Sequence, residues 1–368
     1  MLTTDRTLEK SVVFLHDPAT LVIIWIPPTG DTMHKTLDQK LAAIHADPSG
    51  CREFILADAK DADMAFGIAA PGRHGSEDRF KTLDEFRDQI RQITQQGIVD
   101  IMLMSASTSD QLTMQERLFE NSAVTPAIRA NDTSDIHVFR GSRIGQAASR
   151  PFRTASLDHV QCGHLDCRPE DRGRGANLGL YSITFNNDRD LDLDSLNAYK
   201  QFRDEAERKG FRHFLEVFNP NLPNAVSPGE LPGFINDVIV RTLAGVTSAQ
   251  RPLFLKMAYQ GPRAMEDLVS YDPHLVVGIL GGTAGSTLDA FQLLHDAQKH
   301  GARAALFGRK INQAENQLAF VETLRHVADR LLTPVEAVKA YHSELTKQGL
   351  KPHRSLADDL TLQTHAKS

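Results

Sequence analysis

The chain has 368 residues, of which 41% are hydrophobic and 24% are charged, and its formal net charge is −6. This length allows one large barrel or two ordinary domains, with enough apolar residues for a sizeable core. The negative charge argues against a nucleic-acid partner, and without any run of 18 apolar residues we expect no membrane span. The first residues lack the pattern of a signal peptide, and an odd number of cysteines, three, fits a reducing compartment. We therefore expect a cytoplasmic protein.

The beginning and the end of the chain differ in character from its middle. Apolar runs at 12–15 and 21–26 predict two short strands joined by a turn. We interpret residues 1–50 as an N-terminal extension that covers the bottom or the side of the main domain, which spans residues 51–348. Residues 349–368 are expected to form a loosely ordered tail or to serve in assembly.

From residue 51 onward, strand-like and helix-like segments alternate. Eight apolar runs are typical of buried strands: 53–58, 99–104, 124–130, 178–185, 212–218, 252–258, 274–280 and 302–307. Helical spacing is found at 83–97, 110–121, 192–209, 230–247, 262–270, 286–300, 313–330 and 333–348. Such alternation predicts a parallel sheet, and eight units predict a (β/α)8 TIM barrel with an extra C-terminal helix. The alternative is an open doubly wound sheet, but no glycine-rich fingerprint follows the first strand. Residues 131–178 lack a regular pattern, so we expect them to form a long, partly ordered loop, which we call the excursion.

One lysine, Lys256, lies inside the apolar run 252–259. A buried amine must be paired, neutral or at a working site. Burial disfavours the charged form of an amine and makes it a nucleophile that can form a Schiff base with a carbonyl. The alternative is a lysine whose stem packs while its ammonium reaches water.

Two glycine-containing loops follow the seventh and eighth predicted strands. Loops at these places often hold phosphate in barrel enzymes, because glycine lets the backbone approach an anion and a helix N-terminus offers unpaired N–H groups. Arg309 or Lys310 would supply the countercharge. Either loop alone could simply end a strand. The loop residues are Gly281, Gly282, Thr283, Gly308 and Arg309.

Three blocks, at 254–259, 276–282 and 304–313, carry a resemblance to a known family. The chain is similar there to the class I (Schiff-base) aldolases of the fructose-bisphosphate and tagatose-bisphosphate type. This resemblance implies that Lys256 forms the imine and that Gly281, Gly282, Gly308 and Arg309 hold a substrate phosphate. It also implies that no metal or organic cofactor is needed and that the chain forms homo-oligomers.

The same resemblance implies further site residues. The segment 214–220 resembles the Leu-Glu segment of the tagatose-type enzymes, in which the glutamate relays protons, and Glu216 is its counterpart. Phe218 stands where the fructose-type relatives place a tyrosine. The alternative is that Glu216 merely pairs with Lys256.

At the end of the first strand, Asp58 (or Asp61) matches a family carboxylate that orients substrate hydroxyls. Lys60 stands where the tagatose-type enzymes have an arginine, and Tyr259 is similar to a family tyrosine. The alternatives are a solvated charged loop at 58–63 and a tyrosine at the rim without a role.

Two features do not fit the family pattern. The fourth strand lacks the basic residue that several relatives present there, so a non-phosphate head group, or an arginine from 140–174, could replace that contact. A cluster of His159, Cys162, His164, Asp166 and Cys167 does not have the usual spacing of zinc ligands, and we expect no metal.

The sequence therefore predicts a lyase that cleaves a phosphorylated ketose between C3 and C4, with Lys256 as the imine lysine and Glu216 as the proton acceptor. One alternative keeps the imine but performs a transaldolase-like or dehydratase reaction. The other is a catalytically silent barrel that binds a sugar phosphate. In each case the partner is a small molecule, with neither nucleic acid nor membrane involved.

Overall fold

A computed structural model describes residues 34–74, 77–282 and 285–364, which belong to the unit Met33–Ser368. The two strands predicted at 12–15 and 21–26, and Thr283, lie outside the described residues. No helix in the described ranges is long and apolar enough to cross a membrane.

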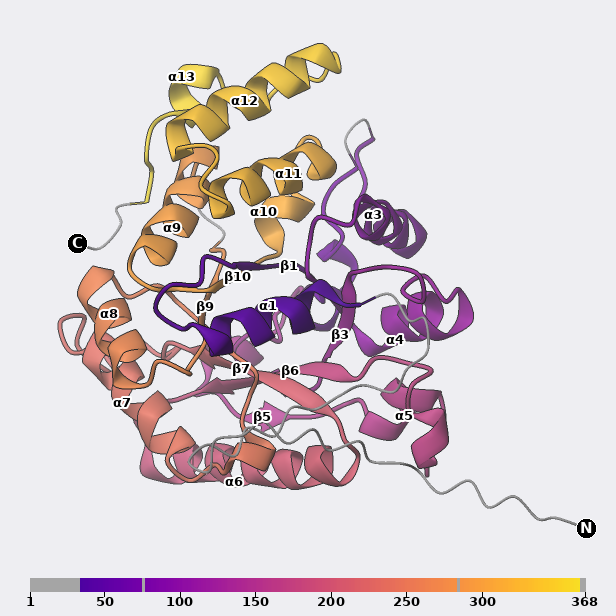
Figure 1. The fold of residues 1–368 in the computed structure, drawn as a ribbon, viewed down its shortest axis with the longest axis vertical. Coiled ribbons are helices and arrows are strands. Elements are labelled where there is room, and N and C mark those ends of the chain that lie inside the picture. Colours follow the sequence, from indigo (N-terminus) through magenta and orange to yellow (C-terminus); the bar gives the residue numbers. More distant parts are fainter. Residues whose placement is uncertain (1–33, 75–76, 283–284, 365–368) are drawn as a thin grey trace, which may run out of the picture. The chain divides into compact units, whose positions relative to one another are not determined.

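A closed barrel of parallel strands forms the centre of this unit (Figure 1). Its strands follow one another around the barrel in the order β1-β10-β9-β8-β7-β6-β3-β2, and β1 pairs with both β10 and β2. The predicted TIM barrel is confirmed, and the open-sheet alternative was wrong. The barrel strands are β1 (Ile55–Lys60), β2 (Ile101–Met104), β3 (Thr125–Arg129), β6 (Leu178–Thr184), β7 (Arg212–Phe218), β8 (Leu255–Met257), β9 (Val277–Leu280) and β10 (Ala304–Phe307).

Along each strand, side chains point in turn toward the interior of the barrel and toward the surrounding helices, and both faces are buried. The inward side chains form one apolar cluster, in which the rings of Phe214 and Phe254 stack at 4.5 Å. The outward side chains, such as Leu215 and Leu255, belong to a second, larger cluster with the helices. Because both faces are apolar, the strands read as nearly continuous hydrophobic runs in the sequence.

The helix α1 (Thr36–Ala46), which the sequence analysis did not predict, packs at the N-terminal end of the barrel. Its apolar residues Leu37, Leu41 and Ile44 are buried in the same cluster as the barrel interior. The amine of Lys35 donates to the carbonyl oxygens of three residues in the segment that leads into β3 (Thr125–Arg129). α1 therefore closes the end of the barrel that lies opposite the carboxyl ends of the strands.

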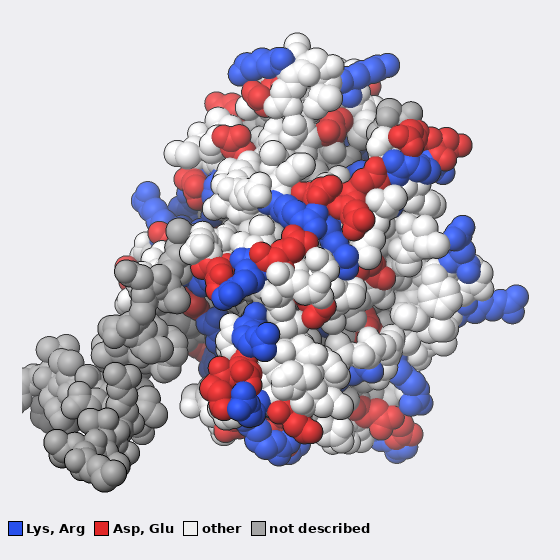
Figure 2. Space-filling model, turned by 90° about the vertical axis from the view of Figure 1, so that its right-hand side faces the viewer, with Lys and Arg blue, Asp and Glu red and all other residues white. Residues whose placement is uncertain are grey.

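Helices surround the strands, and several begin with a capping box. Thr82, Ser286 and Thr333 each accept a hydrogen bond from the backbone three residues on, which satisfies an otherwise unpaired N–H group. The extra C-terminal helix α12 packs on α9 and α11. The helices are α3 (Leu83–Gln96), α6 (Arg189–Arg208), α7 (Leu231–Leu243), α8 (Pro262–Tyr271), α9 (Thr287–Lys299), α10 (Arg309–Asn312), α11 (Gln317–Ala328), α12 (Pro334–Lys347) and α13 (Leu356–Asp359). On the face shown in Figure 2, acidic and basic side chains are interspersed.

Two segments differ from the sequence prediction. Instead of one helix over 110–121, the chain forms the short α4 (Ala106–Ser109) and a π-helical turn over Asp110–Gln115. The excursion 131–178 contains an antiparallel pair, β4 (Asp132–Thr133) and β5 (Pro151–Phe152), and the helix α5 (Leu157–Cys162). The backbone N–H of Val138 donates to the carbonyl of Ala65 at 2.8 Å, so the excursion is tied to the segment that follows β1.

Candidate active site

A cavity of about 130 Å³ opens at the carboxyl ends of the barrel strands, where barrel enzymes place their working residues. We call this cavity the barrel mouth. Its lining comes from six strands and the loops after them, and Ile136 of the excursion also lines it. The lining residues on which the chemistry depends are Asp61, Arg129, Glu216, Lys256, Gly281, Gly282, Gly308 and Arg309.

Lys256 and Glu216 face each other across neighbouring strands. The two residues are paired in the register of β7 and β8, so their side chains leave the sheet on the same face. Lys256 Nζ lies 2.7 Å from Glu216 Oε1, and only 7% and 1% of the two side chains are exposed. The amine is thus ion-paired inside the barrel mouth, and the alternative of an ammonium that reaches bulk water was wrong.

The second carboxylate oxygen of Glu216 is also in contact with polar groups. Ser182 Oγ donates to Glu216 Oε2 at 2.7 Å, and Arg129 Nη2 lies 3.8 Å from the same oxygen. Ser182 is buried on β6, the neighbouring strand. These contacts fix the carboxylate next to Lys256, which is the preorganisation that proton transfer requires.

Arg129, at the end of β3, is a site residue that the sequence analysis missed. Its Nε donates to Asp61 Oδ2 at 2.6 Å, and its Nη1 donates to Ser182 Oγ at 3.2 Å. Burial opposes its charge, but the carboxylates of Asp61 and Glu216 more than compensate and raise the pKa of Arg129. The sequence analysis expected a basic residue from 140–174 in place of the one missing on the fourth strand, whereas the buried basic residue that lines the barrel mouth lies on the third strand. The spacing in the sequence was the available signal: Arg129 follows Ala127 by two residues, and alternate residues of a strand share a face, here the barrel interior.

Asp61, the second of the two carboxylates considered at the end of the first strand, lies in the barrel mouth. Burial alone would raise the pKa of Asp61, but the positive charges of Arg129 and Lys256 lower it below the usual value. Asp61 is therefore a carboxylate held in its ionised form between two cations.

Asp58 and Lys60 do not line the barrel mouth, which corrects the roles predicted for them. Their side chains leave β1 on the opposite face from Ala57 and Ala59, toward the helices. Lys60 Nζ lies 3.1 Å from Asp58 Oδ2 and donates to the side chain of Gln317 at 2.8 Å and to that of Asn312. Burial raises the pKa of Asp58 to about 6, although Lys60 opposes this shift, and burial lowers the pKa of Lys60.

Tyr259 also lies outside the barrel mouth. It packs against the outer apolar cluster, and burial, together with the nearby carboxylates of Asp296 and Glu266, raises the pKa of Tyr259 to about 12. Its hydroxyl has no hydrogen-bond partner among the described residues. The structure therefore does not bring Tyr259 to Lys256.

The glycine loops do line the barrel mouth. A methyl group at Gly308 would lie 2.8 Å from the carbonyl oxygen of Ala59, so only glycine fits there. Gly282 has φ 59°, a conformation that favours glycine. Arg309 is an exposed residue, and its guanidinium lies 5.7 Å from the ring of Phe66 and pairs with no carboxylate in the described ranges, although partial burial lowers its pKa. Arg309 thus offers an uncompensated positive charge at the rim.

The N-terminus of α9 is not free to bind an anion, in contrast to the sequence expectation. The backbone N–H of Thr287 donates to Asp359 Oδ1 at 2.6 Å, and Asp289 and Ser286 form a capping box. Lys310 donates to the carbonyl oxygens of Gly285 and Ser286 at 2.6 and 3.0 Å, so it holds the loop.

The cluster at 159–167 is not arranged as a metal site. Cys162 and Cys167 form a disulfide, which the sequence analysis did not predict, and His159 Nδ1 contacts Ser156 Oγ at 2.6 Å. Within the described ranges, no group of three or more His, Cys, Asp or Glu side chains is placed to hold a metal ion.

Comparison of the whole fold identifies aldolases among the similar solved structures. One is a Schiff-base-forming fructose-1,6-bisphosphate aldolase, with 14% identity, a TM-score of 0.56, and coverage of 79% of this chain and 99% of that chain. The chain shares the fold of these aldolases. An archaeal fructose 1,6-bisphosphate aldolase has 13% identity and a TM-score of 0.55, with 80% of this chain and 99% of that chain covered. The fructose-bisphosphate aldolase from Slackia heliotrinireducens has 13% identity and a TM-score of 0.59, with 84% and 91% covered.

At these identities the likeness concerns the fold alone. No protein-family profile matches the chain, and no curated protein sequence matches it. The arrangement of side chains in the barrel mouth therefore has to carry any functional argument.

Proposed function

We propose that the protein is a class I aldolase-type lyase that cleaves, or forms, a C–C bond in a phosphorylated ketose through a Schiff base on Lys256. The observation that carries this proposal is the 2.7 Å contact between Lys256 Nζ and Glu216 Oε1 inside the barrel mouth. A nucleophilic amine needs a neighbouring base, and retro-aldol cleavage needs a proton acceptor at the same place.

The proposed reaction uses Glu216 twice. Glu216 first takes a proton from the Lys256 ammonium, and the free amine attacks the ketone carbon C2. The nitrogen passes a second proton to the former carbonyl oxygen, Glu216 returns the first proton to the same oxygen, and this oxygen leaves as water, so that the iminium forms. The C3–C4 bond then breaks, its electron pair moves toward the iminium, the C4 hydroxyl proton passes to Glu216, and the aldehyde departs. Protonation of the enamine at C3 and hydrolysis release the ketone and restore the amine.

The charges around this pair suggest how the substrate is held. Arg309 at the rim supports one phosphate, together with the backbone of Gly281 and Gly308. Asp61 can accept hydrogen bonds from substrate hydroxyls, since it is an ionised carboxylate beside Lys256. Arg129 is already engaged by two carboxylates, so we propose that it positions Glu216 and Asp61 and does not take a second phosphate.

The size of the cavity bears on substrate entry. At about 130 Å³ it is smaller than a typical ligand pocket of about 300–1,000 Å³. Ile136 lines it, and the hydrogen bond from Val138 to Ala65 holds this part of the excursion in place. We propose that the segment around Ile136 moves when a ketose enters.

The test is to trap the imine. The protein is incubated with dihydroxyacetone phosphate, reduced with borohydride, digested and mapped by mass spectrometry. We expect a covalent adduct on the peptide that contains Lys256, and none in Lys256→Met protein with native circular dichroism. An intact, folded protein that gives no adduct with dihydroxyacetone phosphate or with a panel of ketose phosphates would contradict the proposal.

One observation favours a catalytically silent barrel as the second candidate. Lys256 is ion-paired in the described structure, and a permanently paired ammonium is no nucleophile. Saturable binding of dihydroxyacetone phosphate without an adduct would support this candidate. If an adduct forms, product analysis separates aldol cleavage from a transaldolase-like or dehydratase reaction. Assembly into homo-oligomers, division at residues 50 and 348, and a cytoplasmic location stay predictions.

A further inference from the structure

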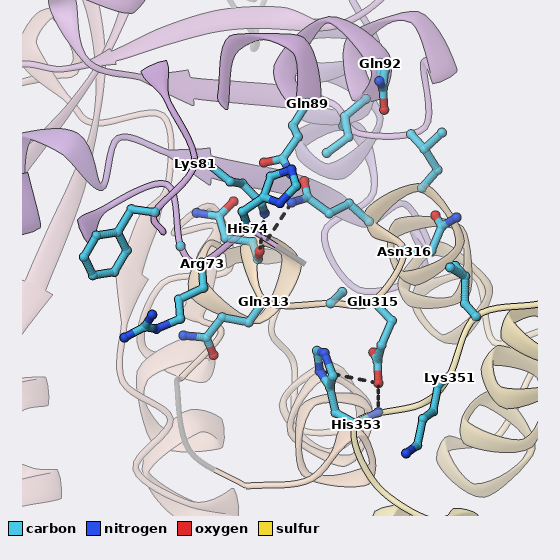
Figure 3. Close-up of a pocket in the computed structure, with 18 of the residues that line it drawn as sticks. Arg73, His74, Lys81, Gln89, Gln92, Gln313, Glu315, Asn316, Lys351 and His353 are labelled. Atoms are coloured by element: carbon cyan, nitrogen blue, oxygen red, sulfur yellow. Dashed lines mark hydrogen bonds and ion pairs between the residues drawn. The ribbon is translucent and has the colours of Figure 1, made fainter. Parts of the chain in front are cut away.

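A second and larger cavity lies outside the barrel, between the segment that leads into α3 and the C-terminal part of the chain. Its volume is about 1,100 Å³, and we call it the outer cleft (Figure 3). Its walls come from residues 69–93 on one side and from 312–318 and 350–353 on the other. None of the residues that line the barrel mouth lines the outer cleft, so the two cavities are separate.

Basic side chains lie on both walls of the outer cleft. Arg73 and Lys81 come from the segment before α3, and Lys351 and His353 come from the C-terminal segment (Figure 3). Lys81 is half-buried, and its amine is 3.5 Å from the backbone oxygen of Asn312. Burial lowers the pKa of Lys81, because solvent alone does not compensate its charge there.

The acidic groups at the cleft are already engaged. Glu315 accepts from the backbone N–H of His353 at 2.6 Å and from the hydroxyl of Tyr341 at 2.9 Å. Asp78 pairs with Arg73 at 2.7 Å at the exposed rim. Because Arg73 pairs with Asp78 and His353 Nδ1 lies 3.5 Å from Glu315 Oε1, the lining lysines without a carboxylate partner among the described residues are Lys81 and Lys351.

An unpartnered donor is buried in the lining. Asn312 is 4% exposed, and its Oδ1 accepts from the buried amine of Lys60. This contact fixes the orientation of the amide, and the Nδ2 group is left without a hydrogen-bond partner among the described residues. This donor is shielded from solvent, so it is not offered to a ligand in the cleft. The side-chain oxygen of Gln89, also in the lining, is likewise unpartnered.

The rest of the lining is rich in amides. These side chains both donate and accept hydrogen bonds, which suits hydroxyl groups. The amide residues are Gln89, Gln92, Asn312, Gln313, Asn316 and Gln317. From these features we infer that the outer cleft is a binding site for a small hydroxylated phosphate ester, with the phosphate near Lys81 and the hydroxyl groups on the glutamine side chains. The inference does not depend on the proposed aldolase activity.

Glycerol 3-phosphate is a suitable probe, because it carries hydroxyls and a phosphate but no carbonyl that could react with Lys256. Binding is measured by isothermal titration calorimetry in Arg309→Gln protein, in which the anion-binding group of the barrel mouth is removed. We expect saturable binding to persist in this protein. The added change Lys81→Gln should weaken it roughly tenfold, since it removes a charge-assisted hydrogen bond.

Two further variants control the result. Lys351→Gln, on the exposed C-terminal segment, should weaken binding only about threefold because exposed charges are screened, and it cannot disturb the core. Lys299→Gln removes the same charge from the exposed end of α9 and should leave binding unchanged. Binding that is lost with Arg309→Gln, binding that is equally strong in the Lys81 and Lys299 variants, or no binding at all would each overturn the inference.

Discussion

The ion pair between Lys256 and Glu216 can be tested through protein stability, independently of any substrate. Removing one partner of a buried pair leaves an uncompensated charge, which typically costs about 3–5 kcal/mol. Both side chains are almost fully buried here, so solvent screening does little to reduce this cost. The two single variants should differ in their loss of unfolding free energy, because different counter-charges remain in each. Glu216→Gln leaves Lys256 and Arg129 with only Asp61 as a counter-charge, whereas Lys256→Met leaves Arg129 to compensate Glu216 and Asp61.

We therefore expect Glu216→Gln to lower the free energy of unfolding by about 4–5 kcal/mol and Lys256→Met to lower it by about 3 kcal/mol. The double variant should cost about 2 kcal/mol less than the sum of the two, because it leaves neither charge alone. Urea denaturation followed by circular dichroism gives the three values, and equal slopes of the transitions are the control. Additive effects, or single losses below about 1 kcal/mol, would refute the view that the two groups form a buried pair.

Three further predictions concern other parts of the site. Burial raises the pKa of Asp58 to about 6, so the protonated carboxyl adds to the free energy of unfolding below about pH 4, and this contribution is lost as the pH rises to 6. In urea denaturation between pH 4 and 6, Asp58→Asn should remove roughly 3 kcal/mol of the change in unfolding free energy with pH. An unchanged dependence of the unfolding free energy on pH would contradict the assignment. Gly308→Ala should cost about 1–3 kcal/mol in thermal or urea unfolding because its methyl would meet the backbone oxygen of Ala59, whereas Gly229→Ala, with open space around it, should cost far less. Arg309→Gln should weaken binding of dihydroxyacetone phosphate roughly tenfold by calorimetry while it leaves the melting temperature unchanged, and equal affinity would remove Arg309 from the phosphate site.

Much of the fold and the central pair could be predicted from the sequence. The alternation of apolar runs and helical segments was sufficient for the barrel, because each βα unit buries one strand and one helix face in sequence order. Lys256 and Glu216 stand at equivalent places near the ends of adjacent predicted strands, and parallel pairing then brings them to one edge of the barrel. The local signals for helix starts at Thr82 and Thr333 were likewise contained in a few neighbouring residues.

The sequence by itself thus determined that the chain forms a barrel and that a lysine and a glutamate meet at its mouth. Only the tertiary structure decided which side of each strand faces the interior, because both faces of a barrel strand are buried and their apolar residues look alike in sequence. That choice sends Asp58 and Lys60 outward to Asn312 and brings Asp61 and Arg129 inward to Glu216. It depends on the closure of the whole sheet, which no local pattern records.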